Sequence, residues 1–316
     1  MQTSDFLAYA AGVSPAAYCQ LFYVTAAATV FAVAAAPKSI HDFLTQYGAR
    51  SAATGTADEK GAKDANDGLF TRVVSWATSV GQVPHSWFKH FYILSLSCSV
   101  FWAAQFLCRG TILDAIARKQ ASEEAASMSI DQVILMWFLM VLQGGRRLYE
   151  YEFVLLPSSS KMWIIHWALG MAFYSCTSVS IWIEGSSSIQ TFDRRFFAVV
   201  APPFNVILGV IGFLVSWTMQ HRCHSYLSGL KKYSLPEDGL FKYLVCPHYT
   251  CECALYFSLA LVAAPKGELY NTTLICAMLF VIANLGVTAH GTKKWYAEKF
   301  GRETVKGKWK MIPLVF

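Results

Sequence analysis

The chain has 316 residues, of which 26 are Lys or Arg and 20 are Asp or Glu, giving a net charge of +6. Charged residues make up 15% of the chain and hydrophobic residues 55%. A typical soluble domain has about 25% charged residues. So little charge could not cover a globular surface in water. This excludes a disordered chain, a basic nucleic-acid-binding domain and an ordinary soluble enzyme. We expect an all-α polytopic membrane protein with no nucleic-acid partner.

Seven apolar stretches are candidates for transmembrane helices, each of which needs about 20 mostly apolar residues. The third and the sixth are short and carry polar side chains. The first is expected to be retained as a helix, because residues 1–15 contain no Lys or Arg and so do not resemble a signal peptide. In chain order the stretches are 16–36, 89–108, 130–145, 161–184, 196–219, 247–264 and 269–291.

Basic residues are concentrated after the seventh stretch, and further ones lie in the connections 37–88, 146–160 and 220–246. Cytosolic segments of membrane proteins carry the excess of Lys and Arg. We therefore predict a lumenal N-terminus and a cytosolic C-terminus. Residues 51–70 are small, polar and charged, which predicts a flexible cytosolic loop between the first and second helices.

The nine cysteines show no paired spacing. Neither Cys251-Glu252-Cys253 nor Cys223-His224 has the ligand pattern of a zinc site, so we expect buried free thiols and no metal. The chain also lacks GxGxxG, Walker and GxSxG motifs. Any bound nucleotide must therefore be held without a soluble Rossmann domain.

Ionisable residues at membrane depth are costly and are therefore candidates for function. Arg146 and Arg147 follow two glycines at the end of the third stretch, and Glu150 comes one helical turn later. Guanidinium groups suit phosphate in a bidentate manner, so the arginine pair is interpreted either as a phosphate site or as a simple topological signal.

Further polar groups accompany the second and sixth stretches and the tail. His248 and Glu252 share one face if the sixth stretch is helical. A buried carboxylate favours a partner for Glu252: His248, a lysine or a bound ligand, with a structural ion pair as the alternative. His90 and Tyr92 are interpreted either as site residues or as part of an interfacial aromatic belt. In the basic tail, interleaved aromatics such as Tyr296 suggest an ordered segment that packs back on the bundle.

Five pieces of the sequence resemble, in the same order, the steroid 5-alpha-reductase family and specifically its polyprenol reductase branch. They cover residues 83–316. The resemblance therefore implies a family-like membrane domain at 83–316, preceded at 1–82 by the first helix and the flexible loop. The pieces are VPHSWFKHFY (Val83–Tyr92), LQGGRRLYE (Leu142–Glu150), RCHSYLSGLKK (Arg222–Lys232), DGLFKYLVCPHYTCE (Asp238–Glu252), and WYAEKF with KMIPLVF in the tail.

The resemblance implies a seven-helix bundle in the endoplasmic reticulum membrane that binds NADPH from the cytosolic side. A long-chain polyisoprenoid substrate would enter from the membrane lipid. His90, Tyr92 and Glu252 are expected as catalytic groups. The sequence departs from the family at Lys293, where histidine is usual, and at His248, where many relatives have asparagine. The expected cofactor-binding residues are Arg146, Arg147, His224, Lys231, Lys232, His248, Tyr249 and Tyr296.

The reaction associated with this branch saturates the α-isoprene unit of polyprenol to make dolichol, the lipid carrier for glycosylation. Hydride addition to a carbon–carbon double bond needs an electron sink, which an allylic alcohol lacks and an α,β-unsaturated aldehyde supplies. We therefore favour polyprenal as the acceptor. A steroid enone or an enoyl thioester would use the same chemistry, and a membrane scaffold or transporter would explain the hydrophobicity alone.

Overall fold

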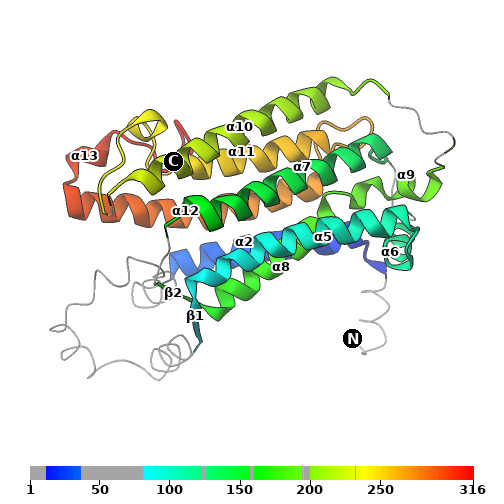
Figure 1. Cartoon of the computed structure of the whole chain (residues 1–316), viewed down its shortest axis with the longest axis horizontal. Helices are drawn as coiled ribbons and strands as arrows, with labels where there is room; N and C mark the ends of the chain where they lie inside the picture. The colour runs from blue at the N-terminus through cyan, green and yellow to red at the C-terminus, as the bar shows by residue number, and fades with distance from the viewer. Residues whose placement is uncertain are drawn as a thin grey trace.

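The computed structural model describes residues 12–36, 81–121, 126–156, 160–193, 195, 200–231 and 233–316. Over these ranges the chain is mostly helical, and seven long helices run side by side in an elongated bundle (Figure 1). Each of the seven expected stretches forms one of them. They are α2 (Pro15–Ala35), α5 (Lys89–Leu107), α7 (Ile130–Tyr149), α8 (Ile164–Ser180), α10 (Phe204–Gly229), α11 (Pro247–Val262) and α12 (Thr272–Phe300).

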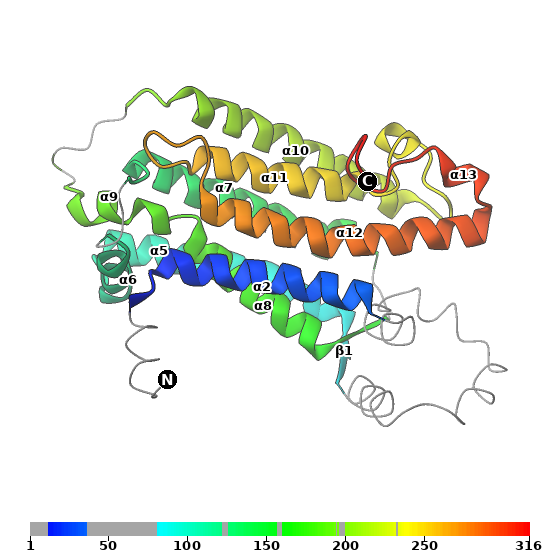
Figure 2. The same cartoon turned by 180° about the vertical axis from the view of Figure 1, so that it is seen from behind.

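The bundle has two layers: α7, α10, α11 and α12 form one, and α2, α5 and α8 form the other (Figures 1 and 2). Buried aromatic side chains join them, because the ring of Phe173 on α8 lies 5.3 Å from that of Phe280 on α12. Tyr23 of α2 is fully buried and packs edge-on against Phe173 of α8, with ring centroids 5.8 Å apart. Its hydroxyl is 3.1 Å from Thr177 Oγ1 and 3.0 Å from Ser180 Oγ, which satisfies the one polar atom that this packing buries.

Five helices in the described ranges are long and apolar enough to cross a membrane. They are α2, α10, α12, the segment His85–Leu107 that includes α5, and the segment Ile164–Thr191 that begins with α8. The remaining two, α7 and α11, are the third and sixth stretches. They carry the polar side chains noted in the sequence, Arg146 and Arg147 on α7 and His248 and Glu252 on α11. The chain is an all-α polytopic membrane protein.

Three helices extend further along the chain than expected, and one of them, α12, runs past residue 291 to Phe300. α10 begins at Phe204 rather than near residue 196, because Pro202 and Pro203 precede it and proline is not tolerated in a helix interior. It then continues past residue 219 to Gly229 and so places His221 and His224 on a helix, not in a connection. α7 likewise runs past residue 145 and carries both Arg146 and Arg147 in its last turn.

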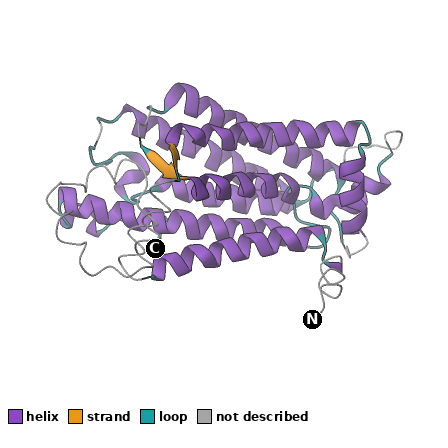
Figure 3. Ribbon diagram, turned by 90° about the horizontal axis from the view of Figure 1, so that it is seen from below, coloured by secondary structure: helices purple, strands orange, loops and turns teal. Residues whose placement is uncertain are grey.

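Several short elements were not expected from the sequence. Strands β1 (Gln82–Pro84) and β2 (Lys161–Trp163) pair antiparallel, with Val83 opposite Met162, at one end of the bundle (Figure 3). Helices α6 (Thr111–Ala121) and α9 (Ser186–Thr191) lie at the other end. Residues 51–70 of the expected flexible loop are outside the described ranges, so the division of the chain at 82/83 stays a prediction.

The C-terminal segment returns to the bundle, which confirms the expectation for the tail. Gly301 ends α12 with a positive φ of 96°, and after α13 (Glu303–Lys306) the chain runs beside the segment before α11. Trp309 O accepts from Val245 N at 2.8 Å, and Lys310 O accepts from Cys246 N at 3.0 Å. The tail therefore holds the backbone that leads into the first turn of α11.

Candidate active site

A fully buried carboxylate, Glu150, gathers four basic side chains where α7 ends. His221 Nδ1 is 2.8 Å from Oε1 and His224 Nδ1 is 2.8 Å from Oε2. Arg147 pairs with Oε2, and Arg146 Nε lies 3.6 Å from Oε1. Glu150 begins the π-helical turn Glu150–Val154, a distortion that is frequent at functional sites. The carboxylate therefore ties α7 to the last turns of α10.

The protonation state of this cluster follows from its contacts. Burial alone would raise the pKa of Glu150, but the hydrogen bond from His224 and the charges of Arg147 and Arg146 hold it well below its ordinary value. The carboxylate is thus ionised at neutral pH. His224 Nδ1 then donates to Glu150, so it cannot at the same time accept from Arg147 Nη1, which lies 2.7 Å away.

Arg146 points into the bundle and is 7% exposed. It donates to the Trp217 carbonyl, to Gln143 Oε1 at 2.8 Å and to Gln220 Oε1, and it lies over the Trp217 ring. Its contacts, like those of Arg147, are with protein acceptors. The phosphate role expected for the arginine pair therefore stays a prediction, and the geometry favours a role inside the site.

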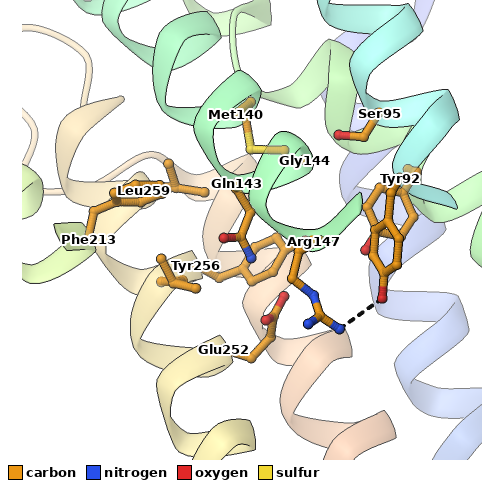
Figure 4. A pocket seen from close by; sticks show the side chains of 12 residues that line it. Tyr92, Ser95, Met140, Gln143, Gly144, Arg147, Phe213, Glu252, Tyr256 and Leu259 are labelled. Atoms are coloured by element: carbon orange, nitrogen blue, oxygen red, sulfur yellow. Dashed lines mark hydrogen bonds between the residues drawn. The ribbon is translucent and has the colours of Figure 1, made fainter. Parts of the chain in front are cut away.

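Arg147 links this cluster to α5. Its Nη2 donates to the Tyr92 hydroxyl at 2.8 Å, a bond drawn as a dashed line in Figure 4. Since a guanidinium group only donates, the Tyr92 oxygen is the acceptor, and the hydroxyl proton remains available to a second partner.

A pocket opens beside this pair, between α5, α7, α8, α10 and α11 (Figure 4). Its polar wall carries Tyr92, Arg147 and Glu252, and its apolar wall carries methionine, leucine and phenylalanine side chains. The pocket is narrow, and it sets polar groups at one wall against apolar side chains at the other, the pattern of a site for a molecule with a polar end and an apolar body. The lining residues are Tyr92, Ser95, Met140, Gln143, Gly144, Arg147, Tyr174, Phe213, Glu252, Leu255, Tyr256 and Leu259.

Gly144 explains how α5 and α7 come close enough to form this wall. A Cβ atom at residue 144 would lie 3.2 Å from Ser95 Oγ and 3.4 Å from the Leu96 side chain. The first distance is tighter than most Cβ contacts, so the Ser95 side chain would have to give by a few tenths of an ångström if residue 144 carried a Cβ. The first glycine of the Gly144-Gly145 pair thus permits a close helix–helix approach.

The structure brings together most of the expected site residues. Tyr92 and Glu252 line the pocket, and the His224 ring lies 5.6 Å from that of His248. The Tyr249 ring lies 4.2 Å from the His248 ring. His248 Nδ1 is buried and has no hydrogen-bond partner within the described ranges. A buried nitrogen of this kind is a group that a bound ligand can satisfy.

Other expected residues lie elsewhere. His90 packs among Trp87 and Trp167, with ring centroids 5.4 and 6.2 Å away, and is not in the pocket lining. Two helical positions are about 200° apart around the axis, so His90 and Tyr92 face different sides of α5. Tyr296 packs in the cluster formed by the tail, Lys231 is exposed, and Lys232 lies outside the described residues.

Two polar residues that were not expected as site residues complete the arrangement. Glu150 was recognised only by its spacing from the arginines. Gln220 is the described hydrogen-bond partner of Glu252, in place of His248 or a lysine. Gln220 lies one helical turn before His224, which could have indicated that both face the site. The fifth stretch was expected to end at residue 219, however, so this relationship was not considered. Among the described residues, no group of three metal-ligating side chains occurs.

The fold and the pocket define an integral-membrane protein whose buried polar cluster meets an apolar pocket. The model of the family described as 3-oxo-5-alpha-steroid 4-dehydrogenase matches residues 160–316. The chain belongs to this family, the steroid 5-alpha-reductases, and is an oxidoreductase of the kind that acts on carbon–carbon double bonds. Membership implies a nicotinamide cofactor.

Several curated relatives carry a more specific name. The chain is 28% identical over 272 residues to "Polyprenal reductase" of Drosophila melanogaster, covering 77% of this chain and 78% of that protein. It is 27% identical over 257 residues to the protein of that name in Caenorhabditis elegans, covering 74% and 79%. A third, from Saccharomyces cerevisiae, is 33% identical over 158 residues, covering 49% and 54%.

Proposed function

We propose that this protein is an NADPH-dependent polyprenal reductase of the endoplasmic reticulum membrane. It saturates the α-isoprene double bond of polyprenal, a step in dolichol synthesis that supports protein N-glycosylation. One observation carries the proposal: the pocket combines a hydrogen-bond donor, Tyr92, with an apolar wall that includes Met140 and Phe213. The names of the relatives agree with it.

The aldehyde is the acceptor that this chemistry favours over the alcohol. Hydride addition at the β carbon moves the electron pair of the double bond toward the carbonyl oxygen, which becomes an enolate oxygen. A proton then adds at the α carbon and the aldehyde is restored. An enolate needs a positioned hydrogen-bond donor. Tyr92 offers its hydroxyl proton at the pocket, and Arg147 stabilises negative charge that develops on the phenol oxygen.

The residues present fit a nicotinamide cofactor. The unpartnered His248 Nδ1, with His224 and Tyr249 beside it, offers a place for the polar end of a nicotinamide ring. Exposed cations at the same end of the bundle, Arg222 and Lys231, suit phosphate groups. When bound, NADPH supplies the hydride.

The experiment is a turnover assay with purified protein in lipid nanodiscs. Polyprenal and NADPH should give the aldehyde that has gained two hydrogens, with one NADPH oxidised for each product, as measured by mass spectrometry and absorbance. Polyprenol, a steroid enone and an enoyl thioester are tested in parallel. Faster reduction of one of these three would assign the protein to that substrate, and the absence of NADPH binding would favour a scaffold.

A further inference from the structure

Gln220 of α10 is a buried amide, 2% exposed, that stands between the arginine cluster and the pocket. Its Oε1 accepts a hydrogen bond from Arg146 Nη2. Its Nε2 donates to Glu252 Oε2 and to the His248 carbonyl oxygen, the latter at 3.3 Å. The side chain therefore uses both amide hydrogens and its oxygen, and its three partners come from α7 and α11.

These contacts fix the orientation of the amide. A guanidinium group has only donors, so the atom that faces Arg146 must be the amide oxygen. The nitrogen then faces Glu252 and the His248 carbonyl, both of which accept. Turning the amide by 180° would place NH₂ against the guanidinium group and oxygen against the carboxylate, which loses all three bonds. The common ambiguity between the two ends of a glutamine does not arise.

The fixed orientation of the Gln220 amide determines the position of the Glu252 carboxyl group. One carboxylate oxygen, Oε2, is held by Gln220, and the Glu252 side chain lines the pocket. An oxygen that accepts from an amide N–H can accept a second hydrogen bond through its other lone pair, so Glu252 fixed in this way presents an acceptor to whatever occupies the pocket. Tyr92, on the same polar wall, can donate its hydroxyl proton. The two catalytic candidates therefore have opposite roles.

We infer that Gln220 is a positioning residue that holds Glu252 as a fixed hydrogen-bond acceptor in the pocket, on the same polar wall as the donor Tyr92. The expected kinetic effect of this inference rests on the proposed function. The hydrogen bond between Gln220 and Glu252 does not depend on it. Arg146 of α7 holds the amide oxygen of Gln220, and the amide nitrogen of Gln220 holds Glu252. The position of Glu252 in the pocket therefore depends on both α7 and α10.

The first test is spectroscopic and independent of the substrate. The infrared carboxylate band of Glu252 is identified as the band that is absent from Glu252→Gln. In Gln220→Leu this band should shift, because the bond to Oε2 is lost. Gln132→Leu is the matched control, since Gln132 is also a buried glutamine that bonds to carbonyls of the α11 end, Val262 O at 2.7 Å and Ala264 O at 2.8 Å. An unshifted band in Gln220→Leu would overturn the inference.

The second test is a double-mutant cycle in the polyprenal assay. Gln220→Leu should lower kcat about tenfold while the KM for polyprenal changes little, as expected for a group acting through the transition state. The double variant Gln220→Leu with Glu252→Gln should be no slower than Glu252→Gln alone. In the control double variant, Gln132→Leu with Glu252→Gln, the two effects on kcat should multiply. Multiplicative loss with Gln220→Leu would contradict the inference. Gln220→Met, closer in shape, serves if the leucine variant does not fold.

The two tests separate the inference from the proposed function. A shifted Glu252 band in a protein that does not reduce polyprenal refutes the proposed substrate and retains the positioning role. Polyprenal reduction with an unshifted band and multiplicative losses retains the substrate and refutes the positioning role.

Discussion

Arg147 donates a hydrogen bond to the Tyr92 hydroxyl oxygen at 2.8 Å, although the two residues are 55 positions apart in the chain. The same guanidinium group pairs with Glu150, so its position is set by the protein before any ligand arrives. A donor fixed in advance costs no reorganisation when charge develops on a substrate oxygen. This relationship makes Tyr92 the side chain on which the proposed chemistry depends most.

The Tyr92→Phe variant tests this role. It removes the hydroxyl and keeps the ring, so the packing of α5 should hold while the enolate oxygen loses its donor. We expect kcat for polyprenal reduction to fall by about 10²–10³-fold, the usual effect of removing one such donor. Steady-state kinetics together with the melting temperature of each variant provide the measurement.

Tyr149→Phe is the matched control for Tyr92→Phe. Tyr149 lies at the same end of the bundle, is 53% exposed and does not line the pocket. Its loss of a hydroxyl should leave turnover within about twofold of the unmodified protein, as is usual for an exposed position. Full activity in Tyr92→Phe would remove Tyr92 from the chemistry.

Glu150→Gln tests the cluster that supports Arg147. Removing one partner of a buried ion pair leaves the other charge uncompensated, which costs about 3–5 kcal/mol. We expect a lower melting temperature and a loss of activity in parallel, because Arg146, Arg147 and His224 lose the negative charge that they share and one of its two acceptor oxygens. Glu152→Gln is the control, because Glu152 pairs with Lys89 at 3.8 Å near the surface, where its side chain is 43% exposed.

The pH dependence of this contribution has a definite sign. The folded protein holds the pKa of Glu150 below its ordinary value, so the unfolded chain takes up the proton first as pH falls. The stability that Glu150 contributes is present above about pH 4.3, the unperturbed value for glutamate. It is lost as pH falls further, toward the folded pKa. The melting-temperature difference between the unmodified protein and Glu150→Gln should therefore be constant from pH 8 to about pH 5 and shrink only below about pH 4.

The sequence predicted the helices better than their ends. Runs of apolar residues located all seven, although five of these helices in the described ranges have the length and hydropathy of a membrane span and α7 and α11 do not. The apolar runs placed the end of the fifth helix near residue 219, where polarity rises, while α10 continues to Gly229. The polar residues of this extension remain helical because partners on other helices satisfy them: His221 and His224 meet Glu150, and Gln220 meets Arg146. Such partners are invisible in a single sequence.

The same limit applies to the candidate site. Glu252 was expected to need a partner because a buried carboxylate is costly, and the structure provides one. Local spacing suggested His248, four residues away, but the partner is Gln220, 32 residues away. His90 and Tyr92 were treated alike, whereas the helical period turns only Tyr92 toward the pocket. Residue chemistry identified the groups, and packing between helices selected their contacts.

The orientation of the bundle is a further prediction. α7, α10 and α12 end at the same end of the bundle, where α5, α8 and α11 begin, and the C-terminus lies there too (Figure 1). This end carries most of the basic residues, so we expect it to face the cytosol. Protease treatment of sealed microsomes should remove a C-terminal tag and spare a lumenal one. A protected C-terminal tag would reverse the orientation and exclude a cytosolic cofactor site.

Lys231 tests the phosphate end of the proposed cofactor site. Lys231 is exposed at the predicted cytosolic end, where a phosphate group could reach its ammonium group. Lys231→Ala should raise the KM for NADPH about tenfold, because a charge-assisted hydrogen bond is worth about 1.5–3 kcal/mol when it is formed. The KM for polyprenal should not change. Lys266→Ala, an exposed lysine at the opposite end of the bundle, is the control, and equal effects of both variants would contradict the assignment.

The depth of the pocket sets how much of the substrate the protein can enclose. The pocket encloses little free space, and fully buried Phe213 and nearly buried Leu259 form part of its apolar wall. Its walls would have to move apart to admit the nicotinamide ring together with the reacting end of the substrate. Only the aldehyde end of the polyisoprenoid then enters, and the rest of the chain stays in the lipid.

We therefore expect kcat/KM to depend little on isoprenoid length once all aldehydes are presented in the same nanodiscs. Phe213→Trp, which fills the pocket, should lower kcat/KM by about tenfold or more for every chain length alike, since small changes in pocket volume have effects of this size. Phe257→Trp on α11 is the control, because Phe257 is 45% exposed on the outside of the bundle. A steep preference for long chains, or a Phe213→Trp effect confined to them, would show that the protein encloses several isoprene units.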